Sequence, residues 1–153
     1  MGDVSEYRDV LNPLLTAQRL AVLATSLEGQ PYGSLVAFAV TDDLGQMLFV
    51  TRKGTYKYHT MLLNNRVAML VDSRRNETSD FAVAHALTAI GTVRDTNGDE
   101  RDLMAKVYLA RHPYLADFLS MSDSSLMAVA VTEYIVAGFD SVRRIHVSAQ
   151  SRS

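Results

Sequence analysis

The segment Thr51–Lys57 concentrates residue types that bind an anion. It reads Thr-Arg-Lys-Gly-Thr-Tyr-Lys, so three cations, two threonines and a glycine fall within seven residues. An apolar run precedes it and helical spacing follows it. That order predicts a helix N-terminus, where free N–H groups and the helix dipole favour an anion such as a phosphate. The segment therefore indicates an anion site, and the alternative is a solvated basic turn with Thr51 or Thr55 as N-cap.

Other familiar catalytic patterns do not occur in the sequence. It contains no GxxxxGK[ST], GxGxxG, GxSxG or HExxH pattern. It also has no cysteine, which excludes disulfides, thiolate nucleophiles and cysteine metal sites. The four histidines lack metal-ligand spacing and are expected to be structural: His59, His85, His112 and His146. No catalytic residue is identified; His59 and Tyr56 are candidates for proton transfer, with packing or cofactor contact as their alternative role.

The elements that must position the basic segment begin with three strands. Apolar runs with β-branched residues occupy residues 20–26, 32–41 and 47–51. Short turns at 27–30 and 42–45 separate these runs, and their glycines allow the chain to reverse direction. Such spacing predicts an antiparallel meander whose third strand ends where the basic segment begins.

The rest of the chain alternates between helical and strand patterns. Helical spacing predicts helices over residues 4–15 and 55–65 and around 103–108. Pro13 kinks or divides the first of these helices, and Pro113 stops or restarts the third. Apolar runs then predict further strands on either side of a polar loop at 73–80, namely 67–72, 85–94, 126–137 and a short one at 142–147.

These patterns predict one mainly β (α+β) domain over residues 1–153. It has six or seven mostly antiparallel strands and two or three helices. A closed or nearly closed barrel buries strands this apolar without leaving exposed edges. The strand at 126–137 is apolar at almost every position, which predicts a second subunit against one of its two faces.

Composition and charge limit the class of protein. The 153-residue chain has 48% hydrophobic and 21% charged residues and a formal net charge of −2, which is typical of soluble globular proteins. This balance gives no reason to expect a nucleic-acid or anionic-membrane partner. The N-terminus carries acids where a signal peptide has bases, and no apolar run approaches the roughly 20 residues that span a bilayer. We therefore expect a cytoplasmic protein.

The stretch TRKGTYKYHTMLLNNRVAML resembles a pattern of the pyridoxamine 5′-phosphate oxidase-like FMN-binding split-barrel superfamily. That pattern is T-x-x-x-S-R-K, followed by a helix and N-x-R-V-A. The stretches VLATSLEGQPYGSLVAFAV and YLARHPYLADFL are also similar to parts of the superfamily. The resemblance implies a six- to seven-stranded antiparallel split β-barrel with two or three flanking helices. It further implies a bound FMN cofactor and a homodimer with FMN at the subunit interface.

The resemblance also implies which residues contact the cofactor. Its phosphate-binding positions fall on Thr51, Thr55, Tyr56 in place of an arginine, and Lys57, with Arg52 and Lys53 available to supply the missing charge. The stretch that lines the isoalloxazine falls on the second strand and beside the end of the third, at Ser34, Leu35, Val36, Ala37 and Val50.

The chain departs from the true pyridoxamine phosphate oxidases at several positions. Ser34 and Ala39 replace their second-strand arginine and lysine, there is no tryptophan, and an R-x-H match at 144–146 is displaced by three residues. The resemblance therefore implies an FMN-dependent oxidoreductase of unknown substrate. The alternatives are a non-enzymatic FMN or electron-carrier module and a haem-binding split-barrel protein, whose resemblance reaches residues 110–113.

Overall fold

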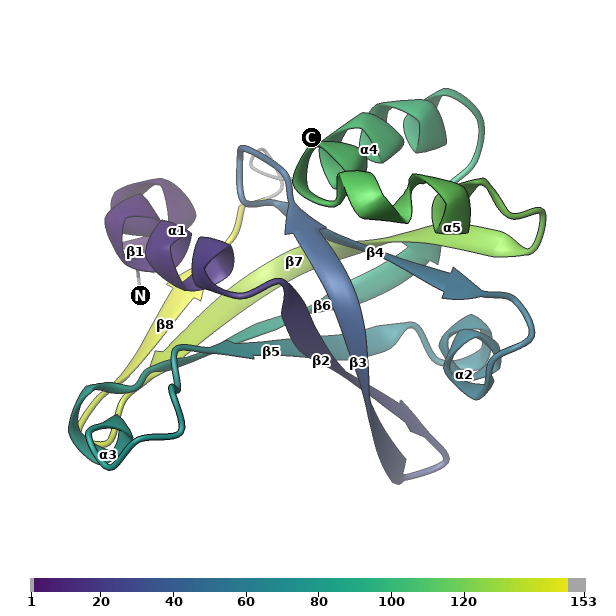
Figure 1. The fold of residues 1–153 in the computed structure, drawn as a ribbon. Helices are drawn as coiled ribbons and strands as arrows, with labels where there is room; N and C mark the ends of the chain where they lie inside the picture. The colour runs from purple at the N-terminus through teal and green to yellow at the C-terminus, as the bar shows by residue number, and fades with distance from the viewer. Residues whose placement is uncertain (1, 149–153) are drawn as a thin grey trace.

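The computed structural model describes residues 2–148 of the chain. Its strands form a single sheet in the order β1-β8-β7-β4-β3-β2-β5-β6, and a further pairing of β6 with β7 closes the six strands β2 to β7 into a barrel (Figure 1). The bounds are β1 Gly2–Asp3, β2 Leu20–Leu27, β3 Gln30–Val40, β4 Gln46–Arg52, β5 Arg66–Asp72, β6 Ala86–Asp95, β7 Ser124–Ala137 and β8 Val142–His146. The predicted mainly β split barrel is confirmed.

Five α-helices and two 3₁₀ turns surround the barrel. They are η1 Val4–Tyr7, α1 Arg8–Ala17, α2 Tyr56–Leu63, α3 Asp80–Val83, α4 Gly98–Arg111, η2 Pro113–Leu115 and α5 Ala116–Ser120. All predicted strands and helices occur, with ends that differ by a few residues. Strand β1 and helix α3 were not predicted, because two or four residues are too few to show a period. The helix count therefore exceeds the two or three expected.

Pro13 lies inside α1 without dividing it. The helix runs from Arg8 to Ala17, and the break in this region comes earlier, at Tyr7, whose φ of −116° and ψ of 18° separate the 3₁₀ turn from the α-helix. Proline removes one backbone donor and pushes away one carbonyl. Leu11 and Leu15, both fully buried in the barrel core, hold the helix in place across that defect.

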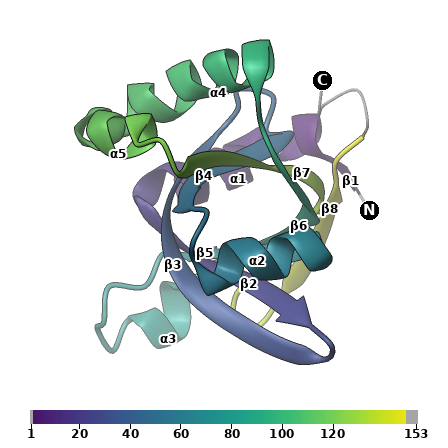
Figure 2. The ribbon, with the colours of Figure 1, turned by 90° about the vertical axis from the view of Figure 1, so that its right-hand side faces the viewer.

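The barrel interior is the main hydrophobic core. Alternate residues of each strand point inward, as a period of two requires, and among them Phe38, Phe49, Met69 and Met127 are at most 1% exposed. Helix α2 lies across one end of the barrel (Figure 2), where Met61 joins the core. Helix α1 lies at the other end (Figure 1).

The first part of strand β7 is buried on both faces within one chain. Its inward residues join the barrel core, whereas Leu126 and Ala128 face outward into a second cluster with Tyr108 of α4 and Leu119 of α5. The burial of the second face therefore does not require a second subunit. The helices that cover this part of the strand come from residues 98–120, which the apolar pattern of β7 alone does not reveal, and the second subunit stays a prediction.

Closure of the barrel depends on β6 and β7. They pair along their length, with a register shift between Ile90 and Gly91. A Cβ at Gly91 would collide with the carbonyl oxygen of Ala130, so only glycine allows this close approach. Within residues 2–148, no helix has the length and apolar character needed to cross a membrane.

Candidate functional site

The hydroxyl groups of Thr51 and Thr55 hold the turn between β4 and α2. Thr55 is the N-cap of α2, and its Oγ1 accepts a hydrogen bond from the backbone N–H of Tyr58 at 3.3 Å. The same hydroxyl donates to the carbonyl of Arg52 at 2.8 Å. Its one proton is thereby used, so the buried Thr51 hydroxyl donates in the 3.1 Å contact between the two threonines. Both hydroxyls are engaged in shaping the turn, and Thr55 is the cap that the alternative interpretation expected.

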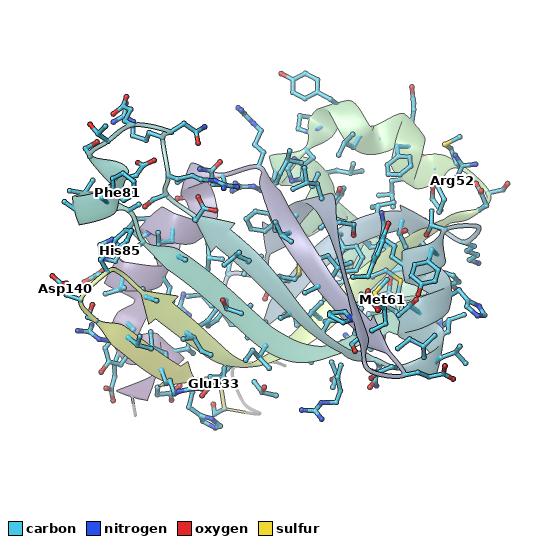
Figure 3. The ribbon with its side chains drawn as sticks, turned by 90° about the horizontal axis from the view of Figure 1, so that it is seen from below. Arg52, Met61, Phe81, His85, Glu133 and Asp140 are labelled. Atoms are coloured by element: carbon cyan, nitrogen blue, oxygen red, sulfur yellow. The ribbon has the colours of Figure 1, made fainter. Side chains whose placement is uncertain are left out.

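The three cations of the turn differ in their partners. Nη2 of Arg52 lies 2.7 Å from Oδ2 of Asp123, and both side chains are partly exposed. This hydrogen bond is the main cause of the lowered pKa of Asp123. Lys53 and Lys57 have no carboxylate within ion-pair distance among the described residues. They are therefore the cations that remain for an anionic ligand. Figure 3 shows Arg52 at the same end of the barrel as Met61 of α2.

Tyr56 connects the turn to the tip of β3. Its ring is half exposed and stands edge-on to the ring of Tyr32, with 5.1 Å between the centroids. The turn follows β4, the neighbour of β3 in the sheet, and it meets the tip of β3 at this end of the barrel. His59 is exposed on α2.

Part of β3 has no strand partner on the side of β4. Strand β3 pairs with β2 over eight residue pairs but with β4 over only three, from Phe38 to Val40. Because the N–H of Phe38 points to Arg19 next to β2, strand alternation turns the backbone groups of Leu35 and Ala37 toward β4. One of them, the carbonyl of Ala37, accepts a hydrogen bond from the Tyr108 hydroxyl at 3.1 Å. Among residues 2–148 no strand pairs with β3 on this side before Phe38, and this part of β3 is called the free edge.

The side chains of the predicted ring-binding stretch have unlike surroundings. Leu35 is 65% exposed, whereas Val36 points into the barrel core and Val50 into the cluster under α4 and α5. Val36 and Val50 can therefore meet a ligand through their backbone only. The Ser34 hydroxyl is buried and has no hydrogen-bond partner among the described residues, and strand alternation places Ser34 on the same face of β3 as Val36.

Three of the predicted site residues line different hollows in a single chain. Lys53 lines a hollow of about 530 Å³ beside α4, Leu35 one of about 280 Å³, and Ala37 one of about 790 Å³. The phosphate and ring assignments stay predictions.

Sequence reasoning missed a polar network beside the turn. The Tyr58 hydroxyl donates to Oδ2 of Asp95 at 2.9 Å, and the Ser125 hydroxyl donates to the same atom at 3.0 Å. Partial burial, and then the bond to Asp95, raise the pKa of Tyr58. The three residues come from α2, β6 and β7, so no local motif could have identified them.

The C-terminal R-x-H match is not positioned as a site. Nη1 of Arg144 lies 2.9 Å from Oε1 of Glu133 in an ion pair on β7 and β8, and His146 is exposed. His112, in the segment that resembles haem-binding members, is buried, and its Nε2 lies 2.6 Å from the carbonyl of Phe38. His112 therefore supports the end of α4 against β3.

Solved structures with the same fold include proteins described as binding different cofactors. The heme binding protein from Mycobacterium smegmatis has a TM-score of 0.77 and 17% identity, over 91% of this chain and 57% of that one. A FAD-binding protein from Mesorhizobium loti has a TM-score of 0.66 and 17% identity, over 82% and 89%. A protein from Clostridium acetobutylicum related to general stress protein 26, of the pyridoxinephosphate oxidase family, has a TM-score of 0.70 and 12% identity, over 92% and 94%.

These identities show a shared fold alone, and the chain spans less than two thirds of the length of the Mycobacterium smegmatis protein. None of the curated proteins matches the sequence. The sequence model of the pyridoxamine 5′-phosphate oxidase family matches residues 7–136, which contain both the basic turn and the free edge of β3. The chain therefore belongs to the pyridoxamine 5′-phosphate oxidase family.

Proposed function

We propose that the chain binds FMN non-covalently, with the phosphate at the start of α2 and the isoalloxazine ring along the free edge of β3. The observation that carries this proposal is the contact between Tyr56 and Tyr32, which brings the basic turn to the tip of β3. From Tyr32 to Ala37 the strand runs five residues, roughly 17 Å. This length is comparable with that of an extended FMN molecule.

The phosphate end is served by Lys53, Lys57 and the helix start. The backbone N–H groups of Tyr56 and Lys57 are the first two of α2 and have no acceptor within the helix. They point outward with the positive end of the helix dipole. Two ammonium groups that form no ion pair among the described residues provide the charge that a phosphate dianion needs. Thr51 and Thr55 fix the shape of the turn. Arg52 adds positive charge near the phosphate while it stays paired with Asp123.

The ring end is served by backbone groups and an apolar surface. The free N–H of Leu35 and of Ala37 would donate to ring oxygen and nitrogen atoms, and the exposed Leu35 side chain would lie against the ring. When bound, FMN supplies hydride or single-electron transfer. The chain's own part is to bind, orient and shield it. Neither Tyr56 nor His59 has the buried, hydrogen-bonded surroundings of a general acid or base, so we assign them no catalytic role.

We further propose a homodimer with FMN at the subunit interface. The outer face of β3 and β5 exposes Leu35 and Leu70, and the three parts of the site open into separate hollows in one chain. A second copy over this face would bury the leucines and cover the ring. In this form the protein is an FMN-dependent oxidoreductase of unknown substrate. The cytoplasmic location inferred from the sequence stays a prediction.

The absorbance spectrum of the purified protein tests the proposal. Flavin bands, with FMN identified by mass after denaturation, are the expected result. Colourless protein that gains no flavin absorbance during titration with FMN would contradict it. Flavin that is bound but not reduced by nicotinamide or other small donors, and that exchanges electrons only with a protein partner, would instead indicate the electron-carrier alternative.

Haem is the second candidate, because the fold is shared with the heme binding protein from Mycobacterium smegmatis. The structure argues against His112 as its iron ligand, since that ring is buried and hydrogen-bonded to Phe38. A histidine ligand from this chain would have to be an exposed one, such as His59. Addition of haemin distinguishes the candidates, because a Soret band that disappears on substitution of His59 by alanine would favour haem.

A further inference from the structure

A basic hollow of about 790 Å³ lies where the end of α1, the start of β2 and the end of α4 meet. Its basic side chains are Arg19, Arg111 and His112, and no aspartate or glutamate from the described part of the chain lines it. The other residues of its wall are uncharged, namely Thr16, Ala17, Gln18, Leu20, Ala37, Tyr114 and Leu115. Two guanidinium groups thus face one space without a carboxylate.

Arg111 is fixed in this hollow by the carbonyl groups that end α1. Its Nη2 donates to the carbonyl of Thr16 at 3.3 Å and to that of Gln18. Its guanidinium also lies over the ring of Phe38, 5.3 Å from the centroid. A carbonyl at a helix C-terminus carries a partial negative charge, so these contacts explain why one arginine stands here.

They do not explain the second arginine. The Arg19 side chain is exposed and has no ion pair or hydrogen bond among the described residues. Burial, and then the positive charge of Arg19, lower the pKa of Arg111. The two cations therefore repel each other across the hollow, and an oxyanion between them would relieve that repulsion.

The surroundings also favour a ligand with an apolar body. Leu20 is 51% exposed and, with Gln18, lines both this hollow and the adjoining one that contains Leu35. Tyr114 is 94% exposed at the rim. Exposure of such a surface to water is unfavourable, and its burial under an apolar group lowers the free energy.

We infer that this hollow binds a small organic acid whose carboxylate or phosphate pairs with Arg19 and Arg111 and whose apolar part lies on Leu20. Ala37 belongs both to this hollow and to the stretch proposed to line the isoalloxazine. The acid would then lie beside the ring, as an oxidisable substrate or an electron acceptor. This last step rests on the proposed FMN function, whereas the binding itself does not.

Titrations of the FMN-free protein with benzoate and phenyl phosphate, followed by amide chemical shifts, test the site. Inorganic phosphate and neutral benzamide are compared in parallel. We expect saturable shifts at Arg19, Ala37 and Tyr114 with at least one of the two aromatic anions, and none with benzamide. The stronger of the two identifies the carboxylate or the phosphate as the preferred group. Inorganic phosphate binding as tightly as both would contradict the apolar part of the assignment.

The deciding variant is Arg19→Gln. This substitution should lower the affinity for the anion about tenfold, as loss of one charge-assisted contact predicts. Arg19→Lys should keep most of the affinity. The control is Arg66→Gln, an equally exposed arginine on β5, which should bind as the wild type. Wild-type affinity in Arg19→Gln would overturn the inference, and so would the absence of saturable shifts.

An independent FMN titration of the same proteins separates this result from the proposed function. Anion binding with no FMN binding would refute the flavin proposal, whereas the inferred anion site would still stand. If FMN binds, benzoate or phenyl phosphate should shift the flavin bands, and unchanged bands at saturation would overturn the placement beside the ring.

Discussion

The Arg52 guanidinium lies 2.7 Å from the Asp123 carboxylate and ties the end of β4 to the residue just before β7. The backbone N–H of Lys53 donates to the carbonyl of the same Asp123 at 2.8 Å. The turn that carries the predicted phosphate site is therefore anchored from outside itself. This anchoring leaves Lys53 and Lys57 as the cations of the turn that form no ion pair within 2–148, and the next prediction depends on them.

Replacement of both Lys53 and Lys57 by alanine should lower the affinity for FMN about a hundredfold. Two charge-assisted contacts at about 1.5 kcal/mol each account for that loss. Fluorescence quenching of FMN during titration measures the affinity. Lys106→Ala, an exposed lysine on α4, is the matched control and should bind FMN as the wild type does. An unchanged affinity in the double variant would mean that the phosphate lies elsewhere.

Replacement of Thr55 by valine should destabilise the fold by about 1–2 kcal/mol. Valine keeps the size of the side chain but removes the N-cap of α2 and the contact with Thr51. Urea denaturation measures the free energy of unfolding. Thr92→Val changes an exposed threonine on β6 and should be nearly neutral. Equal stabilities of the two variants would show that the cap contributes nothing.

The sequence was informative where a signal is local. Apolar runs with β-branched residues predicted every long strand, and the cations and threonines at 51–57 predicted a capped helix start. It failed where two distant segments meet. Asp123 follows Arg52 by 71 positions, and the helices that cover β7 come from a separate stretch. Neither contact leaves a mark in the pattern of one segment, so the pairing of Arg52 and the covered face of β7 emerged only from the fold.

Asp80 should organise its loop only while its carboxylate is charged. It accepts backbone hydrogen bonds from Arg75, Asn76 and Glu77, and the bond from Arg75 is the largest cause of its lowered pKa. Because the folded pKa lies below the ordinary value of 3.8, this contribution is present above that value and disappears as the pH falls through the folded pKa.

Amide shifts of residues 75–77 should therefore titrate together with Asp80, with a midpoint below that of an unstructured aspartate. In Asp80→Asn the same amides should show no such midpoint. Asp140→Asn, in the turn between β7 and β8, is the control and should leave the midpoint unchanged. Titration of these amides at the ordinary aspartate pKa would show that the carboxylate does not hold the loop.

Tyr108→Phe tests the contact by which α4 supports the edge of β3. The buried Tyr108 hydroxyl donates to the carbonyl of Ala37 at 3.1 Å, and its loss should cost about 1 kcal/mol of unfolding free energy at neutral pH. Burial raises the pKa of Tyr108 from 10.0 to about 12. The unfolded chain releases this proton first as the pH rises, so wild-type stability should fall between pH 10 and pH 12.

The variant lacks this ionisation and should lose less stability than the wild type over the same range, so the two stability curves should approach each other. Tyr114→Phe, at an exposed tyrosine, should run parallel to the wild type. Denaturant unfolding at several alkaline pH values gives both curves. A constant difference between Tyr108→Phe and the wild type from neutral pH to pH 12 would mean that the hydroxyl ionises as readily in the folded chain as in the unfolded one, and that α4 does not bury it against β3.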